Sequence, residues 1–128
     1  MAALSNYLEN AMINAVLRGV QYTSPQKVYV GLFLSDPTDK NNGTEVSAAS
    51  YERQAITFEE PVDGETSNNK DVLFPVTTED WGTITHIGLY DAQTAGNLLW
   101  RGQLEFSKEI VLSSQFKIPR NYLIVRLK

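Results

Sequence analysis

Residues 83–106 read TITHIGLYDAQTAGNLLWRGQLEF, and this stretch decides the fold. Residues 83–90 have the composition of a β-strand, and residues 91–97 follow as a turn that ends in a Gly-Asn pair. A second strand is expected over residues 98–106, in which alternate apolar residues share one face: Leu98, Trp100, Leu104 and Phe106. The sequence therefore predicts an antiparallel β-hairpin.

Five shorter runs elsewhere in the chain also predict strands, and turn residues separate them. They cover residues 28–34, 51–58, 71–74, 115–118 and 122–127. The first of them is apolar on both faces, which is typical of an inner strand. Two polar loops, 36–50 and 59–70, are long for a compact β domain, and such loops are usually functional or mobile.

The start of the chain predicts one helix, over residues 4–18. Its main apolar stripe repeats at three- and four-residue spacing and consists of Leu4, Leu8, Ala11, Met12 and Ala15. Asn6 with Glu9 resembles a capping box, and Gly19 suits the position after the helix end. Three further apolar residues lie outside the stripe, where a helix packed only on its own sheet carries polar residues: Tyr7, Ile13 and Leu17.

These three residues are therefore the candidate subunit interface, and a homo-oligomer is expected. The alternative is that Ile13 and Leu17 belong to the internal core. The complete pattern predicts one mainly β domain over residues 1–128, with the helix at 4–18 and a β body at 27–128. The expected fold is an antiparallel β-sandwich or partly open barrel with one N-terminal α-helix.

Composition excludes several classes of protein. The chain has no cysteine, so disulfides, thiolate metal sites and thiol nucleophiles are excluded. Its net charge of −4 disfavours nucleic acid as a partner. No apolar run approaches the roughly twenty residues of a membrane span, and the first residues do not resemble a secretory signal.

The charge is unevenly distributed along the chain. Residues 36–71 hold nine acidic and three basic side chains, whereas residues 97–128 hold two acidic and six basic ones. Ordinary solvated loops and strand faces explain this distribution. The second interpretation is an acidic and a basic pole through which copies of the chain stack on one another.

Motifs for chemistry are scarce. The single histidine, His86, lies within a predicted strand without a nucleophile motif, so a structural role is favoured over catalysis. Calcium is the most reasonable metal, because four oxygen-bearing residues share one loop: Asp36, Asp39, Asn41 and Glu45. Their spacing fails the EF-hand register, and we expect neither a metal site nor a cofactor. Trp81, in a turn, could belong to a carbohydrate platform, whereas Trp100 shares a face with core residues.

Several strings in the chain resemble a family of small bacteriophage virion proteins, the phage tail-fibre proteins. The strings follow one another in order over nearly the whole chain: residues 28–37, 45–58, 74–91, 97–102 and 116–119. The most specific of them is Trp81-Gly82 followed by His86-Ile87-Gly88-Leu89-Tyr90-Asp91.

The resemblance implies a structural virion protein without enzymatic activity, made in the cytoplasm of the host bacterium. It implies a place in the tail, the tail-fibre attachment, the collar or the baseplate region, with itself and other virion proteins as partners. It also makes His86 and Trp81 determinants of the fold. Two alternatives stay open: a head decoration protein, and a receptor module that binds a host-surface sugar through exposed Trp81 and neighbouring tyrosines.

Overall fold

The computed structural model describes residues 2–127, which contain one helix and nine strands. In chain order, the elements are β1 (Ala2–Leu4), α1 (Asn6–Leu17), β2 (Val28–Phe33), β3 (Gln54–Ile56), β4 (Glu65–Ser67), β5 (Val72–Leu73), β6 (Gly82–Tyr90), β7 (Leu98–Ile110), β8 (Lys117–Ile118) and β9 (Ile124–Arg126).

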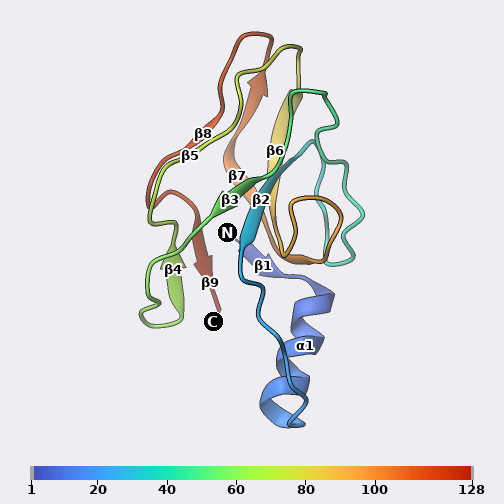
Figure 1. Ribbon diagram of the computed structural model, residues 1–128, viewed down its shortest axis with the longest axis vertical. Helices are drawn as coiled ribbons and strands as arrows, with labels where there is room; N and C mark the ends of the chain where they lie inside the picture. The colour runs from blue at the N-terminus through green and yellow to red at the C-terminus, as the bar shows by residue number, and fades with distance from the viewer. Residues whose placement is uncertain (1, 128) are drawn as a thin grey trace.

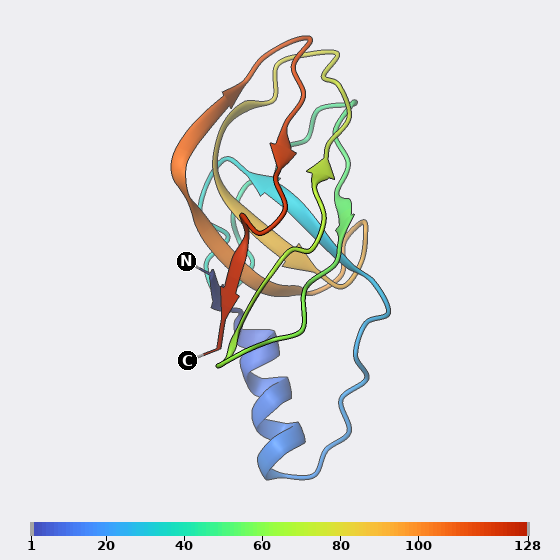
Figure 2. The same cartoon turned by 90° about the vertical axis from the view of Figure 1, so that its left-hand side faces the viewer.

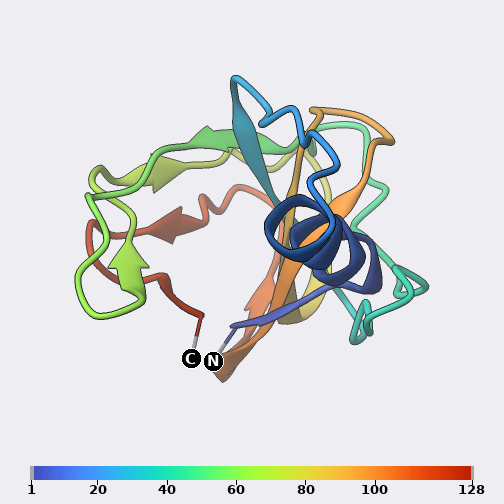
Figure 3. The same cartoon turned by 90° about the horizontal axis from the view of Figure 1, so that it is seen from below.

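The strands form one main sheet and two small strand pairs that lie opposite it (Figures 1 and 3). The main sheet has the order β1-β7-β6-β2-β3, and the small pairs are β4–β9 and β5–β8. Every pairing is antiparallel, and the sheets do not close into a barrel. The expected fold class, mainly β with one N-terminal helix, is therefore confirmed.

The core fills the space between the main sheet and the small pairs. Strands β2 and β6 supply its centre, where Val30, Leu32 and Ile84 are fully buried. The opposite layer contributes Val72, Ile118 and Val125 to the same cluster. The predicted hairpin is present as β6 and β7, with Leu89 opposite Trp100.

Strand β7 is longer than predicted and contains a wide bulge. Ile84 of β6 pairs with Lys108, and His86, two residues later, pairs with Gln103. Residues 104–107 of β7 therefore lie opposite the single residue Thr85 of β6. The bulge breaks the alternation of inward and outward side chains. Phe106 is consequently 77% exposed. A second register shift, between Leu89 and Tyr90, pairs Leu98 with Tyr90 in a separate small cluster, whereas Trp100 packs against the main core. The prediction that Leu98, Trp100 and Phe106 share one face is therefore wrong.

The predicted loop at 59–70 contains a hairpin. Val62 and Glu65 exchange two backbone hydrogen bonds of 2.9 and 3.1 Å around Asp63 and Gly64, both of which have positive φ. Strand β4 follows and pairs with β9. The Asp-Gly pair is the sequence signal that identifies such a two-residue turn.

The acidic and basic segments of the sequence meet within one molecule. Ion pairs join Asp36 and Asp39 to Arg101, and further pairs join Asp71 to Lys117, Glu59 to Arg120 and Glu65 to Arg126. Each pair links residues 36–71 with residues 97–126. The charge asymmetry along the chain is therefore an intramolecular match across neighbouring strands, and the interpretation as two poles for stacking copies is wrong.

Candidate functional site

The helix is anchored to the β body at its first turn. Ser5, which is 1% exposed, donates its backbone N–H to the carbonyl of Leu99 at 2.9 Å and its hydroxyl to the carbonyl of Leu98. The same hydroxyl oxygen accepts a hydrogen bond from the backbone N–H of Leu8 at 3.2 Å. Ser5 is thus the N-cap. The prediction that the helix begins at residue 4 with Asn6 in the cap is wrong, because residues 2–4 form β1.

Beyond that turn, α1 projects away from the β body, and residues 18–27 return along it to β2 (Figures 1 and 2). Gly19, with φ of +67°, takes the predicted position after the helix end. We call α1 together with residues 18–27 the arm. The arm is a protrusion joined to the β body at both ends, and most of its surface faces solvent.

The inner face of α1 matches the predicted stripe. Leu8 is buried, and Ala11, Met12 and Ala15 are half-buried. The opposite face carries a second apolar group at i, i+3 and i+4 spacing, composed of Ile13, Val16 and Leu17. These side chains are 53, 76 and 77% exposed. We call this group the arm patch; it is unusual because a helix that packs on one side only carries polar residues on the other.

The structure brings two of the three predicted interface residues together. Ile13 and Leu17 are one helical turn apart in the arm patch, and their exposure excludes the alternative that they belong to the internal core. Tyr7 is 42% exposed but lies on another side of the helix, near Tyr22. Burial, and then the neighbouring Tyr7, raise the pKa of Tyr22. Val16 was not predicted, although its spacing from Ile13 places it beside them on the same face of the helix.

The opposite end of the molecule is a tip formed by residues 75–81 and 110–115 (Figures 1 and 2). Thr77, 2% exposed, is its centre: its N–H donates to the carbonyl of Ser114 at 2.8 Å, and its carbonyl accepts from Ser113 at 3.1 Å. Its hydroxyl donates to the carbonyl of Val111 at 2.6 Å and accepts from the N–H of Ser114 at 2.8 Å. These bonds hold the two turns of the tip side by side.

The tip carries an apolar surface of its own. Val76, Val111 and Leu112 are 57, 45 and 56% exposed, and we call them the tip patch. Leu112 is held in place because its backbone N–H donates to Asp80 at 2.8 Å. The patch is therefore presented by a hydrogen-bonded framework and not by a loose loop.

A buried polar cluster fixes the loops around residues 41–53 and 91–97. The guanidinium of Arg53 makes two hydrogen bonds of 2.9 Å to the carboxylate of Glu45 and donates to the carbonyls of Ala92 and Ala95 at 3.0 and 2.7 Å. It also lies 3.6 Å from the centroid of the Tyr90 ring, in a cation–π contact. Nearly all of the five N–H donors of the guanidinium have an acceptor. The charge can therefore be buried, and the side chain is only 8% exposed.

Tyr51 completes this cluster. Its hydroxyl donates to Glu45 and accepts from the backbone N–H of Leu32 at 2.9 Å. Burial, followed by the hydrogen bond to Glu45, raises the pKa of Tyr51 well above its ordinary value. Gly31 is required beside the cluster, because a Cβ there would lie 2.7 Å from Glu45 Oε2. Residues scattered through the strings that carry the family resemblance thus meet at one place and serve the fold.

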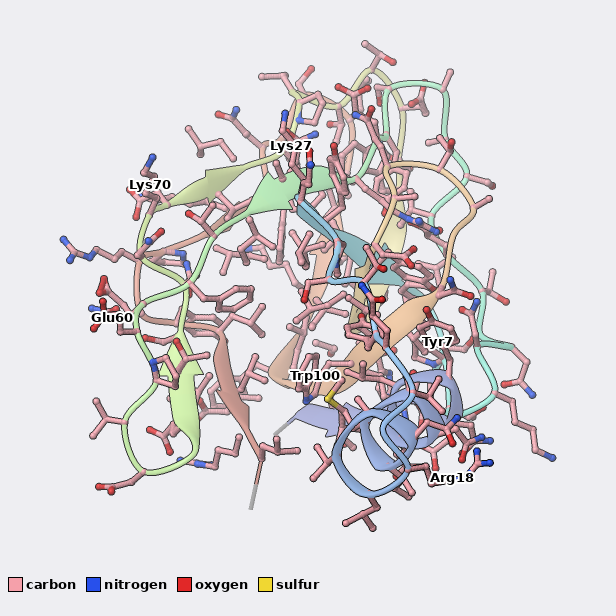
Figure 4. The ribbon with its side chains drawn as sticks, turned by 60° about the horizontal axis from the view of Figure 1, so that its bottom comes forward. Tyr7, Arg18, Lys27, Glu60, Lys70 and Trp100 are labelled. Carbon is pink, nitrogen blue, oxygen red and sulfur yellow. The ribbon has the colours of Figure 1, made fainter. Side chains whose placement is uncertain are left out.

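The three remaining candidates from the sequence, His86, Trp81 and Trp100, each contact other residues of the β body. His86 is half-buried in β6, with its Nδ1 2.8 Å from the hydroxyl of Thr85. Trp81 is 4% exposed and donates its indole N–H to Ser50, so it is not part of an exposed carbohydrate platform. Trp100 packs against the core between the layers (Figure 4), and its indole nitrogen has no hydrogen-bond partner among the described residues.

The four candidate calcium ligands do not converge on one point, because other side chains engage them. Asp36 and Asp39 pair with Arg101, Glu45 pairs with Arg53, and Asn41 accepts a hydrogen bond from the hydroxyl of Tyr90. Within residues 2–127, no three His, Cys, Asp or Glu side chains are grouped to hold a metal ion.

In the part of the chain that the structure describes, no helix has both the length and the apolar character needed to cross a membrane.

Comparison with known proteins adds one match. A family model described as "Podophage GP4 fiber I protein gp80" matches residues 3–126, which includes the arm, both sheet layers and the tip. No curated protein matches the chain.

Proposed function

We propose that this chain is a non-enzymatic building block of a phage tail, and that it acts by self-assembly and by docking to other virion proteins. The proposal starts from the family: the chain belongs to the Podophage GP4 fiber I protein gp80 family. A family of phage fibre proteins supports a structural role in the virion. The finer assignment, to the tail, the fibre attachment, the collar or the baseplate region, is part of this proposal.

The observation that carries the proposal is the arm patch. A surface helix of a monomeric protein would expose polar side chains where α1 exposes Ile13, Val16 and Leu17. Covering these three side chains contributes on the order of 5 kcal/mol before the costs of association. That free energy is sufficient to decide whether a small interface forms, so we assign the arm patch to a contact between subunits.

Nothing in the surroundings of the candidate chemical residues favours an enzyme or a sugar-binding module. A sugar-binding platform would need an exposed Trp81, but Trp81 lies in the core beside Phe74 and Tyr51. His86 hydrogen-bonds to a threonine hydroxyl. Among the described residues, no hydrogen bond or ion pair joins its ring to an acid that could orient it for catalysis.

The test compares oligomeric state and folding in arm variants. Ile13→Asp and Leu17→Asp are expected to keep the circular dichroism spectrum of the native chain, because both side chains are exposed, and to lose the species larger than a monomer in sedimentation velocity. Val62→Asp is the matched control, since Val62 is 69% exposed and lies outside the arm. Folded arm variants with an unchanged oligomeric state would refute this proposal.

A further inference from the structure

The molecule has an apolar patch at each end of its longest axis. The arm patch lies at one end and the tip patch at the other, with the β body between them (Figures 1 and 2). Each patch presents three aliphatic side chains that are about half-exposed or more. Two separate patches on opposite ends are suited to a contact between different surfaces of neighbouring copies, which is a heterologous interface.

The charges beside the two patches are opposite in sign. Residues 10–27 of the arm contain Arg18 and Lys27 and no acidic residue. Arg18 lies at the outer end of the arm, where it donates only to Asn14 among the described hydrogen bonds (Figure 4). The tip contains Glu79 and Asp80 and no basic residue.

The two carboxylates of the tip have no cation beside them among the described residues. Asp80 accepts a backbone N–H, and Glu79 accepts from the hydroxyls of Ser50 and Thr78. These hydrogen bonds, that of Ser50 first, lower the pKa of Glu79. Neither residue is in any of the ion pairs formed by residues 2–127. The tip therefore offers negative charge next to an apolar surface.

We propose that the arm patch of one copy docks on the tip patch of the next, so that copies associate head to tail. This inference rests on the proposed function, because it names the surface that receives the arm. In this arrangement Ile13, Val16 and Leu17 cover Val76, Val111 and Leu112, while Arg18 approaches the acidic tip. Pairing two arms side by side in parallel would instead bring two Arg18 side chains together, and pairing two tips would bring four carboxylates together.

A head-to-tail contact leaves a free arm at one end of a pair and a free tip at the other. Copies therefore add until a ring closes or a filament extends. Each junction covers only a few side chains, whereas a standard stable interface buries about 1,600 Å². The contact is therefore weak, and we expect the size of the assembly to depend on protein concentration.

The experiment is a complementation test with one variant for each end. Leu17→Asp adds a negative charge to the arm patch, and Leu112→Lys adds a positive charge to the tip patch, so each variant repels its partner surface. Both positions are exposed and should leave the circular dichroism spectrum unchanged. Val62→Lys, on an exposed site outside both patches, is the control. Sedimentation velocity is measured for each variant alone and for an equimolar mixture.

The head-to-tail contact predicts that each variant alone is a monomer and that the mixture forms a dimer or a larger species. In the mixture, the intact arm of the Leu112→Lys chain docks on the intact tip of the Leu17→Asp chain, and the two altered ends carry opposite charges and do not repel each other. Assembly of Leu112→Lys as in the native chain would overturn the head-to-tail contact and leave the arm as an interface. A mixture that stays monomeric would also overturn it. An unaffected Leu17→Asp variant, or a native chain that is monomeric throughout, would overturn the proposed function as well.

Discussion

Replacing Arg53 by methionine should destabilise the fold more than any surface change. Methionine keeps much of the side-chain volume but removes the charge. Glu45, whose side chain is 24% exposed, then loses its cation, and the carbonyls of Ala92 and Ala95 lose their donor. Breaking a buried ion pair from one side costs about 3–5 kcal/mol, and the partial exposure of Glu45 favours the lower end of that range. We therefore expect a loss of about 3 kcal/mol.

A loss of this size lowers the urea midpoint by about 1–2 M and the melting temperature by about 10 °C. Urea denaturation followed by tryptophan fluorescence measures it. In the double variant Glu45→Gln with Arg53→Met, the two costs should overlap by about 2 kcal/mol, because the second change removes the charge that the first leaves unpaired. Arg126→Met is the control, since its ion pair with Glu65 is about 40% exposed and exposed pairs are worth about 1 kcal/mol or less. A cost of Arg53→Met no larger than that of Arg126→Met, or simple additivity with Glu45→Gln, would refute the reasoning.

Two further changes test the same structure. The pKa of Tyr51 and that of Tyr90 are raised by burial first, Tyr90 to about 12, so the folded state favours the neutral phenols. Their contribution is complete below the ordinary pKa of 10 and is lost as the pH rises above it, by about 1.4 kcal/mol per pH unit for each tyrosine. We expect the urea midpoint to fall from about pH 10 to pH 12, and less steeply in Tyr51→Phe; equal slopes would count against the buried phenol. Thr77→Val removes the hydroxyl that joins the two turns of the tip, which should cost about 2 kcal/mol in thermal denaturation. Thr94→Val, on an exposed turn, should cost almost nothing, and similar values for the two would contradict the role of Thr77.

Elements with a strong local pattern were predictable from the sequence. The two-sided apolar run at 28–34 and the hairpin at 83–106 became β2, β6 and β7, because their strand character follows from the apolar and β-branched residues of each run itself. β4 was missed because its residues, Glu65, Thr66 and Ser67, are polar and only half-buried. Its pairing is set by the Asp63-Gly64 turn and by β9, which lies about sixty residues away in sequence.

The candidate site shows the same division. The excess of apolar residues on α1 identified Ile13 and Leu17, since their exposure follows from helical geometry alone. Tyr7 could not be assigned, because its side depends on where residues 18–27 return along the helix. The tip patch was not predictable either, because Val76 and Leu112 come from segments more than thirty residues apart that meet through the hydrogen bonds of Thr77 and Asp80.

The long sequence separation between β4 and β9 has a consequence for synthesis. Ribosomes deliver the chain from its N-terminus at about 5–20 residues per second, so the β6–β7 hairpin leaves the ribosome several residues before its opposite layer can form. The acidic segment at 36–71 exists by then, but Lys117, Arg120 and Arg126, which pair with it, are translated later. Val30, Ile84 and the rest of the inner face are consequently uncovered until translation reaches β9. A chain terminated before residue 124 would therefore lack β9 and leave part of the apolar inner face of the main sheet uncovered.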